Sequence, residues 1–259
     1  MLKEKQLFET VDKVVIAIDR LRTFEPSEGY YLAFSGGKDS VVIKQLAIEA
    51  GVKFDAHYSV TTIDPPDLIY YIREHHPDVI WERPEMPFLT KMVENKFPPM
   101  RQQRWCCRLY KENGGSGRLV VTGIRKEESD TRSKRKMVEH CIKDASKRLL
   151  HPIIDWLDDD VWAFIKDRNL PYCCLYDEGW KRIGCLFCPM QRNKAIKQQQ
   201  MDRYPAFVRA FKRACDRIWA IRNKEGKKND FKDGQALFDW WISGQGNKKE
   251  DGQLWLYEG

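Results

Sequence analysis

Residues 30–50 have the sequence YYLAFSGGKDSVVIKQLAIEA, and this stretch decides the fold class. Its apolar start predicts a buried strand, and its end predicts a helix that Gly51 closes. Between them, the glycines of the SGGKDS string allow a tight turn that brings backbone amides close to phosphate oxygens. An ordinary strand-to-helix turn is the alternative, but the full string favours a phosphate site.

The side chains of this loop also suit a bound phosphate. Ser35 and Ser40 supply hydroxyl donors, and Lys38 supplies positive charge. Asp39 is unusual beside a phosphate unless it meets Mg²⁺, which prefers oxygen ligands and is held in proteins by carboxylates together with phosphates. The predicted nucleotide-binding loop therefore consists of Ser35, Gly36, Gly37, Lys38, Asp39 and Ser40.

Strands and helices alternate beyond this loop. Further strands are predicted at 52–62, 78–84 and 118–125, with a fifth, short edge strand at 149–156. Helices are predicted at 67–77, 87–97 and 158–169, between or after the strands. This alternation is typical of βαβ units. It predicts an α/β fold, Rossmann-like, with a mainly parallel five-stranded sheet flanked by helices.

Ligands of such sheets bind beyond the carboxyl ends of the strands. Three polar segments lie at predicted strand ends: Ser35–Ser40, Thr61–Asp64 and Gly123–Arg125. Because the ends of parallel strands meet at one edge of the sheet, we expect these segments to converge there.

The composition is that of a globular protein, with 42% hydrophobic, 12% aromatic and 32% charged residues among 259. The apolar runs are too short to span a bilayer, and the N-terminus lacks the apolar centre of a signal peptide. We therefore expect a cytoplasmic protein without membrane association. Residues 1–25 are predicted to form an amphipathic helix, with the apolar positions Leu7, Val11, Val14, Val15, Ile18 and Leu21.

The C-terminal part is basic and helical. Residues 192–228 contain twelve Lys or Arg against three Asp or Glu, a local excess of nine, whereas the whole chain has a net charge of +7. Such a stripe is either a solvated helix face or a surface for a polyanion such as nucleic acid. The predicted organisation is an N-terminal helix (1–25), a nucleotide-binding domain that includes the cysteine site (26–190) and a basic helical region (191–259).

Six of the eight cysteines are grouped in pairs rather than scattered. A reducing cytosol disfavours disulfides, and clustered cytosolic cysteines indicate metal or redox chemistry. Cys141 and Cys215 stand alone and are predicted to be buried, inert thiols. The grouped ones are Cys106-Cys107, Cys173-Cys174 and Cys185-x-x-Cys188.

The SGGKDS string resembles the PP-loop of the ATP pyrophosphatase superfamily. Members of that superfamily have an adenine nucleotide alpha hydrolase-like fold, cleave ATP between the α and β phosphates, and generally adenylate an acceptor. The segment TGIRKEESDTR (122–132) resembles the second signature of the phosphoadenylylsulfate reductase branch. The resemblance covers about residues 30–190. It implies that Gly123, Arg125 and Arg132 also contact the nucleotide or the anionic substrate.

The cysteine pattern resembles that of iron–sulfur adenylylsulfate reductases. In that group a tandem pair and a C-x-x-C pair hold one 4Fe-4S cluster, which implies the ligands Cys106, Cys107, Cys185 and Cys188. Zinc also accepts four thiolates, but adjacent cysteines are awkward at zinc sites, so an iron–sulfur cluster is favoured. Cys173 or Cys174 could substitute for one ligand. That exchange would free a thiol to carry sulfur as a persulfide.

Two features favour sulfur insertion over sulfonucleotide reduction. The reductases use a nucleophilic cysteine near the C-terminus, whereas this sequence has no cysteine after Cys215. The reductases also usually carry a degenerate loop, whereas SGGKDS is intact. VTTIDPPDLIYYI, GIRKEES and LYDEGWKRIGCLFCP most resemble the ATP pyrophosphatase component of DNA phosphorothioation systems.

This resemblance implies ATP and Mg²⁺ as cofactors, a cysteine desulfurase as sulfur donor, and a nucleic-acid acceptor, DNA being favoured over transfer RNA. Lys38, Asp39 and Arg125 are the predicted catalytic residues. Lys38 would stabilise the leaving pyrophosphate, Asp39 would position Mg²⁺, and Arg125 with Arg132 would clamp the substrate phosphate. Glu128 would either orient an arginine or form an ordinary surface ion pair. Two other hypotheses stay open, a phosphoadenylylsulfate or adenylylsulfate reductase and a non-catalytic nucleotide-binding regulatory subunit. The sequence also allows a homo-oligomer.

Overall fold

The computed structural model describes residues 2–5, 10–227 and 229–244. The chain forms two units. The first comprises Met1–Val60, Asp64–Arg83 and Asn113–Gly184, and the second comprises Thr61–Ile63, Pro84–Glu112 and Cys185–Gly259. This division differs from the predicted boundaries at 25 and 190. The reason is that segment 84–112 packs with the C-terminal helices, so that, for example, Trp241 donates a hydrogen bond to the carbonyl of Pro99 at 2.8 Å.

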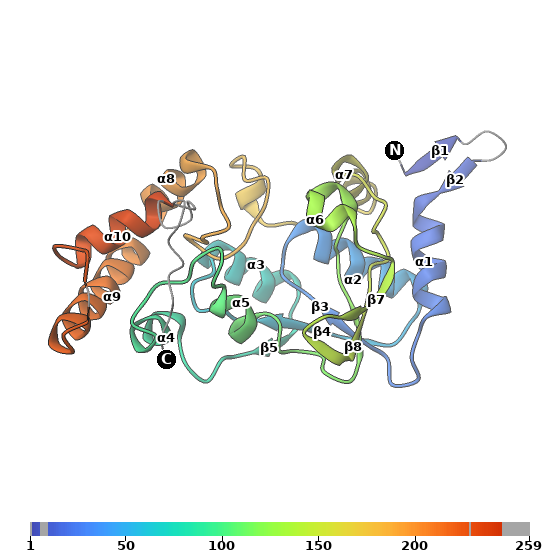
Figure 1. Cartoon of the computed structure of the whole chain (residues 1–259). Coiled ribbons are helices and arrows are strands. Elements are labelled where there is room, and N and C mark those ends of the chain that lie inside the picture. The colour runs from blue at the N-terminus through green and yellow to red at the C-terminus, as the bar shows by residue number, and fades with distance from the viewer. Residues whose placement is uncertain (1, 6–9, 228, 245–259) are drawn as a thin grey trace. The chain divides into compact units, whose positions relative to one another are not determined.

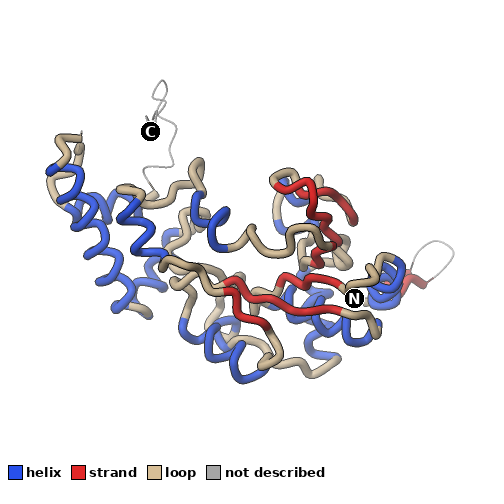
Figure 2. The backbone as a smooth tube through the Cα atoms, turned by 90° about the horizontal axis from the view of Figure 1, so that it is seen from below, coloured by secondary structure: helices blue, strands red, loops and turns tan. Residues whose placement is uncertain are grey.

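The first unit is built on a six-stranded sheet with strand order β5-β4-β3-β6-β8-β7. All neighbouring strands run parallel except β7 and β8, which are antiparallel. The strands, red in Figure 2, are β3 (Tyr30–Ala33), β4 (Phe54–Ser59), β5 (Ile80–Glu82), β6 (Leu119–Val121), β7 (Val138–Cys141) and β8 (Asp144–Leu150). The α/β, mainly parallel architecture is confirmed, but the sheet has six strands rather than five.

The additional strand changes the edge of the sheet. The strand expected at the edge, at 149–156, is β8, which begins earlier and lies between β6 and β7. β7 was not predicted, because the hairpin 138–148 is largely polar and lacks a strand's apolar alternation. Its exposed residues, including His140 and Ile142, hide the period-2 signal that a half-buried strand normally shows.

Helices connect the strands of the first unit (Figure 1). α2 packs against both α1 and α7. Val42, Ile43 and Leu46 of α2 are fully buried, so the helix that follows the glycine loop is anchored in the core. The helices are α1 (Lys13–Thr23), α2 (Lys38–Ala50), α3 (Pro66–His75), α6 (Asp130–Ser133) and α7 (Asp158–Asp167), with 3₁₀ turns η1 (Lys126–Glu128) and η2 (Cys174–Tyr176).

The N-terminal prediction was wrong in its extent. α1 begins only at Lys13, because Asp12 caps it by accepting the amide of Val14 at 2.9 Å. Before it, β1 (Lys3–Lys5) and β2 (Thr10–Asp12) form a two-stranded antiparallel sheet. Leu7 lies outside the described residues. Of the predicted apolar stripe, Val14 and Leu21 are buried whereas Val15 is exposed.

The position of β3 creates a switch in the direction of the chain. From β3 the chain moves outward through β4 to β5, then returns to β6 on the other side of β3. Ligands of open α/β sheets bind at such a point, beyond the carboxyl ends of the two diverging strands. The SGGKDS loop follows β3, and Gly123 with Arg125 follows β6. The topology therefore brings the two predicted signatures to one place.

The second unit is helical (Figure 1). Its aromatic core includes Phe88, Phe211 and Trp241, with the Phe211 and Trp241 rings stacked at 5.3 Å between centroids. The predicted basic helical region is interrupted at Tyr204, because Pro205 begins a new helix there. The helices are α4 (Phe88–Glu94), α5 (Trp105–Tyr110), α8 (Lys194–Arg203), α9 (Pro205–Lys224) and α10 (Gly234–Ser243).

Among the helices in the described part of the chain, none combines the length and apolar composition that crossing a bilayer requires. Residues 245–259, which include the C-terminal stretch compared above with the reductases, lie outside the described residues.

Candidate functional site

The glycine loop turns sharply between β3 and α2. Gly36 has φ +71°, in the left-handed region that favours glycine, and a Cβ there would lie 2.7 Å from side-chain carbons of Leu68 and Ile72. Gly37 caps α2 without any side-chain hydrogen bond. Ser40 donates its hydroxyl to the Gly37 carbonyl at 2.7 Å. Gly36 therefore lets the loop turn closely against Leu68 and Ile72 of α3, and the Ser40 hydroxyl holds the backbone of the turn.

Gly123 allows the second signature to approach the first. A Cβ on Gly123 would lie 2.9 Å from the carbonyl and Cβ of Asp39, which is closer than van der Waals contact permits. The loop after β6 therefore meets the first turn of α2 directly, and this contact places Arg125 beside Asp39.

Arg125 is almost fully buried, with 3% of its surface exposed, and contacts three carboxylates. Its guanidinium donates to Asp39 at 2.7 Å, to Asp158 at 2.7 Å and to Glu127 at 2.8 Å. Burial by itself would lower the pKa of Arg125, but the carboxylates outweigh burial and leave the pKa raised. The guanidinium donors of Arg125, the predicted phosphate clamp, therefore bind carboxylates of the protein itself.

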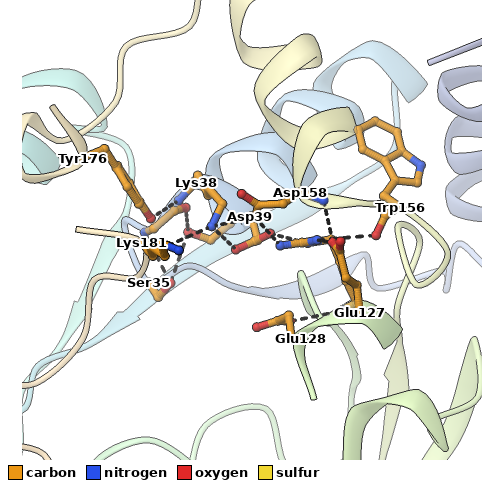
Figure 3. Close-up of polar contacts among 12 residues, drawn as sticks. Ser35, Lys38, Asp39, Glu127, Glu128, Trp156, Asp158, Tyr176 and Lys181 are labelled. Atoms are coloured by element: carbon orange, nitrogen blue, oxygen red, sulfur yellow. Dashed lines mark hydrogen bonds and ion pairs between the residues drawn. The ribbon is translucent and has the colours of Figure 1, made fainter. Parts of the chain in front are cut away.

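Lys38 joins the same network from the first turn of α2. Its Nζ lies 3.1 Å from the Asp158 carboxylate, 3.9 Å from that of Asp39 and 3.2 Å from the carbonyl of Lys181 (Figure 3). Its backbone amide donates to the Tyr176 hydroxyl at 2.9 Å. Lys38 is itself 5% exposed, so this cation is held in place rather than extended into solvent.

The rest of the second signature forms a smaller cluster beside Arg125. Glu128 accepts the amide of Arg125 at 3.1 Å and forms an ion pair with Arg132. Ser129 caps the short helix α6 by accepting the amide of Arg132. About a quarter of the Arg132 side chain is exposed (28%), so it is more accessible than Arg125. Asp64, from the predicted polar segment Thr61–Asp64, is buried in the first unit.

The four predicted ligand cysteines all belong to the second unit. Cys106 and Cys107 lie on α5 and are hydrogen-bonded to each other, which raises the pKa of Cys106 and lowers that of Cys107. The charges of Cys185 and Cys188 also act on Cys106 and raise its pKa further. The fold therefore groups the tandem pair and the C-x-x-C pair, although seventy-seven residues separate them in sequence.

The turn that carries Cys185 and Cys188 is fixed at its middle. The Leu186 amide donates to the Ile63 carbonyl at 2.9 Å, and the Phe187 amide donates to Gln200 at 2.9 Å. Phe187 has φ +55°, which is uncommon for a bulky residue and is supported here by complete burial of its ring.

Several cations surround these thiols. Arg104 and Lys111 help to lower the pKa of Cys107, and buried Lys197 is close enough to Cys188 to interact with its charge. In the described part of the chain, no three His, Cys, Asp or Glu side chains are arranged as ligands of a single ion. A four-iron cluster makes a different demand, because each thiolate binds its own iron.

Cys173 and Cys174 belong to the first unit, whereas the other grouped cysteines belong to the second. Cys173 is fully buried and Cys174 is exposed. Cys141 is half-buried at the end of β7, and Cys215 is buried in α9 as expected.

The basic region presents a row of arginines on α9. Arg209, Arg213 and Arg217 are spaced by one helical turn and are exposed. Lys212 instead lies over the Phe238 ring at 5.5 Å and is half-buried. The candidate polyanion surface is therefore this row rather than the whole stripe.

Sequence reasoning missed three residues of the network around Lys38. Asp158 was included only as the first residue of the predicted helix 158–169, and Tyr176 and Lys181 were not singled out. The signal for Asp158 was its position directly after the predicted fifth strand, another carboxyl end of the sheet. Tyr176 and Lys181 carry no local signal, because they reach Lys38 from a segment about 140 residues away.

Comparison with known proteins shows the family and the fold of this chain. The model of the phosphoadenosine phosphosulfate reductase domain matches residues 29–191. An adenosine 5'-phosphosulfate reductase of Staphylococcus haemolyticus is 29% identical over 182 residues, covering 64% of this chain and 72% of that protein. An uncharacterized protein of Methanocaldococcus jannaschii is 27% identical over 223 residues, 82% of this chain but only 44% of the archaeal protein. The crystal structure of phosphoadenylyl-sulfate reductase from Candida auris shares the fold, with TM-score 0.53, 18% identity, and coverage of 66% of this chain and 89% of that one.

Proposed function

The chain belongs to the phosphoadenosine phosphosulfate reductase family, and we propose that it cleaves ATP to AMP and pyrophosphate in order to activate a nucleic-acid phosphate for sulfur insertion. The observation that carries this proposal is the intact SGGKDS loop at the switch point, with Lys38 and Asp39 held by Asp158 and Arg125. A phosphate oxygen of the acceptor would attack the α-phosphorus of ATP, and pyrophosphate would leave with the bonding electron pair.

Lys38 and the start of α2 would stabilise the leaving pyrophosphate. The first turn of a helix concentrates amide donors and positive potential, and a lysine placed at that turn adds a full charge. Because Lys38 is buried, its interaction with a phosphate is screened less than that of a surface lysine. Nζ is already oriented by the Lys181 carbonyl, so little ordering is needed on binding.

The carboxylates of the network suit a divalent cation that arrives with ATP. Asp39, Glu127 and Asp158 carry three negative charges against the two positive charges of Lys38 and Arg125. Mg²⁺ is bound by one or two carboxylates plus substrate phosphates, and it neutralises phosphate charge. Asp39 and Asp158 would hold it, while Arg125 keeps both carboxylates in position.

An iron–sulfur cluster fits the second unit. Cys106, Cys107, Cys185 and Cys188 would be its ligands, since the fold groups these four thiols and sets cations beside them. Four thiolates around an iron–sulfur core leave net negative charge, which Arg104, Lys111 and Lys197 would offset. The cluster would supply a redox-active centre whose potential depends on such neighbouring charges.

DNA is the proposed acceptor, with sulfur supplied by a cysteine desulfurase. The row Arg209, Arg213 and Arg217 supports this choice, because phosphate contacts give affinity without reading sequence. A transfer RNA offers the same backbone charge, so DNA and transfer RNA have to be compared as acceptors by experiment.

Reduction of adenosine 5'-phosphosulfate is the second candidate function. It is supported by two relatives of that printed name, whose alignments cover 64% and 53% of this chain. That reaction needs a thiol that takes up sulfite and a reductant such as thioredoxin.

The deciding experiment measures pyrophosphate release from ATP and Mg²⁺ by anaerobically purified protein, with and without DNA or transfer RNA. We expect release that a nucleic acid stimulates, loss of release in Lys38→Ala, and normal release in the control Lys166→Ala, which removes an exposed lysine of α7. Pyrophosphate release without any nucleic-acid effect would contradict the proposed acceptor. Absence of release together with thioredoxin-dependent sulfite formation from adenosine 5'-phosphosulfate would establish the second candidate instead. Absence of both activities would indicate a regulatory subunit.

A further inference from the structure

We propose that Cys174 is the thiol that carries the transferred sulfur, as a persulfide, and that Cys173 is the thiol that releases it. This inference rests on the proposed function, since it names the residues that complete sulfur insertion once the acceptor phosphate has been adenylated. Neither the family model nor the relatives assign a role to this pair.

Exposure singles out Cys174. All eight cysteines are among the described residues, and within that set Cys174 alone is exposed. A sulfur carrier must meet both a donor protein and the acceptor, so it needs an accessible thiol. Cys215 is fully buried, and the four cysteines grouped in the second unit are the candidate cluster ligands.

The position of Cys174 places it next to the nucleotide loop. Cys174 begins η2, and Tyr176, at the end of the same turn, accepts the Lys38 amide at 2.9 Å (Figure 3). The Lys181 carbonyl contacts Lys38 Nζ at 3.2 Å, so residues 174–181 meet the start of α2 at two points. The amides of Tyr176 and Asp177 donate to the carbonyls of Cys173 and Cys174, at 3.1 and 3.0 Å, which fixes the turn. A sulfur atom carried on Cys174 is therefore one short turn of the chain away from Tyr176, which contacts the nucleotide loop.

Cys173 is suited to releasing the sulfur from Cys174. Its thiol is fully buried and hydrogen-bonded to Cys174. Because Cys173 is buried and Cys174 is exposed, Cys174 is the thiol that meets the sulfur donor first. The Cys173 sulfur already lies against the sulfur that it must attack.

The geometry of adjacent cysteines makes the resulting disulfide transient. Consecutive Cα atoms are about 3.8 Å apart, below the usual range of about 4.4–6.8 Å for a disulfide. A disulfide formed outside that range is strained, and strain makes it more easily reduced. Such a pair suits a catalytic cycle better than a structural crosslink.

The reaction balances in four steps. The Cys174 thiolate attacks the outer sulfur of a donor persulfide, forming Cys174–S–SH and releasing the donor thiolate. The terminal sulfur then loses its proton to solvent and attacks the adenylated phosphorus, and the P–O bond breaks with its electron pair leaving on AMP. Next, Cys173 loses its thiol proton to solvent and attacks the Cys174 sulfur as a thiolate. The S–S bond to the transferred sulfur breaks, its electrons stay on the phosphorothioate, and a Cys173–Cys174 disulfide forms. A dithiol reductant then restores both thiols by donating two electrons.

Loading of sulfur tests the proposal independently of ATP cleavage. The full-length protein, purified anaerobically with its metal content intact, is treated with glutathione persulfide, alkylated, digested and analysed by mass spectrometry. We expect the additional sulfur on Cys174, loss of that signal in Cys174→Ser, and no change in Cys141→Ser, which alters a half-buried thiol on β7. Sulfur found mainly on another cysteine, or labelling that persists in correctly folded Cys174→Ser, would overturn the proposal.

Turnover tests the second thiol. With ATP, Mg²⁺, nucleic acid and persulfide but no reductant, the wild-type protein should accumulate a Cys173–Cys174 disulfide in proportion to the phosphorothioate formed. Cys173→Ser should still load sulfur but lose phosphorothioate formation, whereas equal product from Cys173→Ser would refute the releasing role. If wild-type protein loads Cys174 yet releases no pyrophosphate, the proposed ATP cleavage fails while the sulfur carrier stands, so the two failures are distinguishable.

Discussion

The Tyr176 hydroxyl accepts a hydrogen bond from the backbone amide of Lys38 at 2.9 Å, at the first helical residue of α2. The amides of this turn are the donors that a helix N-terminus offers to a phosphate. Tyr176 also lies with its ring 5.5 Å from Lys38 Nζ and packs edge-on against Trp162. One aromatic side chain therefore contacts both the amide and the ammonium group of the proposed phosphate-binding lysine.

Replacing Tyr176 by Phe should tighten ATP binding. The substitution keeps the ring but removes the oxygen that competes with a phosphate for the Lys38 amide. A neutral hydrogen bond is worth about 1 kcal/mol, which corresponds to about fivefold in the dissociation constant for ATP. Titration calorimetry measures this constant, and Tyr172→Phe is the matched control because its hydroxyl bonds to Asp177 instead. Weaker binding by Tyr176→Phe would mean that the hydroxyl contacts the nucleotide itself.

Arg125→Gln should lower both stability and pyrophosphate release. It leaves the carboxylates of Asp39, Glu127 and Asp158 close together without their shared cation. Because those carboxylates are partly exposed, we expect a loss of about 3 kcal/mol in the free energy of unfolding, the lower end for broken buried pairs. Urea denaturation measures it. Adding Asp158→Asn should recover part of the loss, and a double variant as unstable as the sum of the single ones would argue against the shared network.

Cys185→Ser should abolish stable cluster binding. Removing one of four thiolates leaves an iron without its protein ligand. Iron and acid-labile sulfide, measured on protein purified without oxygen, should fall to background, whereas Cys141→Ser should retain both. Full iron and sulfide in folded Cys185→Ser would remove Cys185 from the ligand set.

Neutralising the basic row of α9 should weaken DNA binding and its salt dependence. The variant replaces the three arginines of the row, Arg209, Arg213 and Arg217, together with their half-buried neighbour Lys212, by Gln. Each lost phosphate contact lowers the slope of log affinity against log salt by about 0.9, so the slope should fall by about three to four. Fluorescence anisotropy over a range of salt concentrations measures it. A control that neutralises Lys53, Arg73, Lys143 and Lys166 changes the net charge equally, and an equal effect there would indicate non-specific attraction.

Stability should fall as the pH drops below the ordinary pKa of histidine, because His76 is buried in neutral form. The Lys44 ammonium, which can only donate, lies 3.3 Å from Nδ1, so Nδ1 accepts and Nε2–H donates to the Tyr71 hydroxyl at 3.0 Å. Burial first, and then the charge of Lys44, lowers the pKa of His76 to about 4, partly opposed by Asp78.

The direction of this change in stability follows from proton uptake by the unfolded chain. Between about pH 6.5 and 4 the unfolded chain binds a proton at His76 that the folded chain excludes. The contribution of neutral His76 to the free energy of unfolding is therefore fully present above pH 6.5. It is lost as the pH falls, by about 3 kcal/mol in total. Urea unfolding at several pH values measures it. His76→Gln should flatten this part of the profile, and an unchanged slope would assign the pH dependence to other groups.

The sequence alone was enough to predict the α/β class and the glycine turn between a strand and a helix at SGGKDS. Alternating strands and helices are a local signal, and SGGKDS between a buried strand and a helix constrains the backbone wherever it occurs. The pairing of Cys106-Cys107 with Cys185-x-x-Cys188 as cluster ligands came from the resemblance to iron–sulfur reductases, and it stays a prediction. Such features depend on neighbours in the chain or on the chemistry of one residue type.

The tertiary structure decided which side chains complete the site. Asp158, Tyr176 and Lys181 reach Lys38 only because the chain returns to β6 beside β3 and then crosses the carboxyl edge of the sheet. It also placed Arg125, the predicted phosphate clamp, in contact with three carboxylates. Contacts between residues a hundred positions apart are set by strand order and by close approaches such as that of Gly123 to Asp39, which leave no pattern in either segment alone.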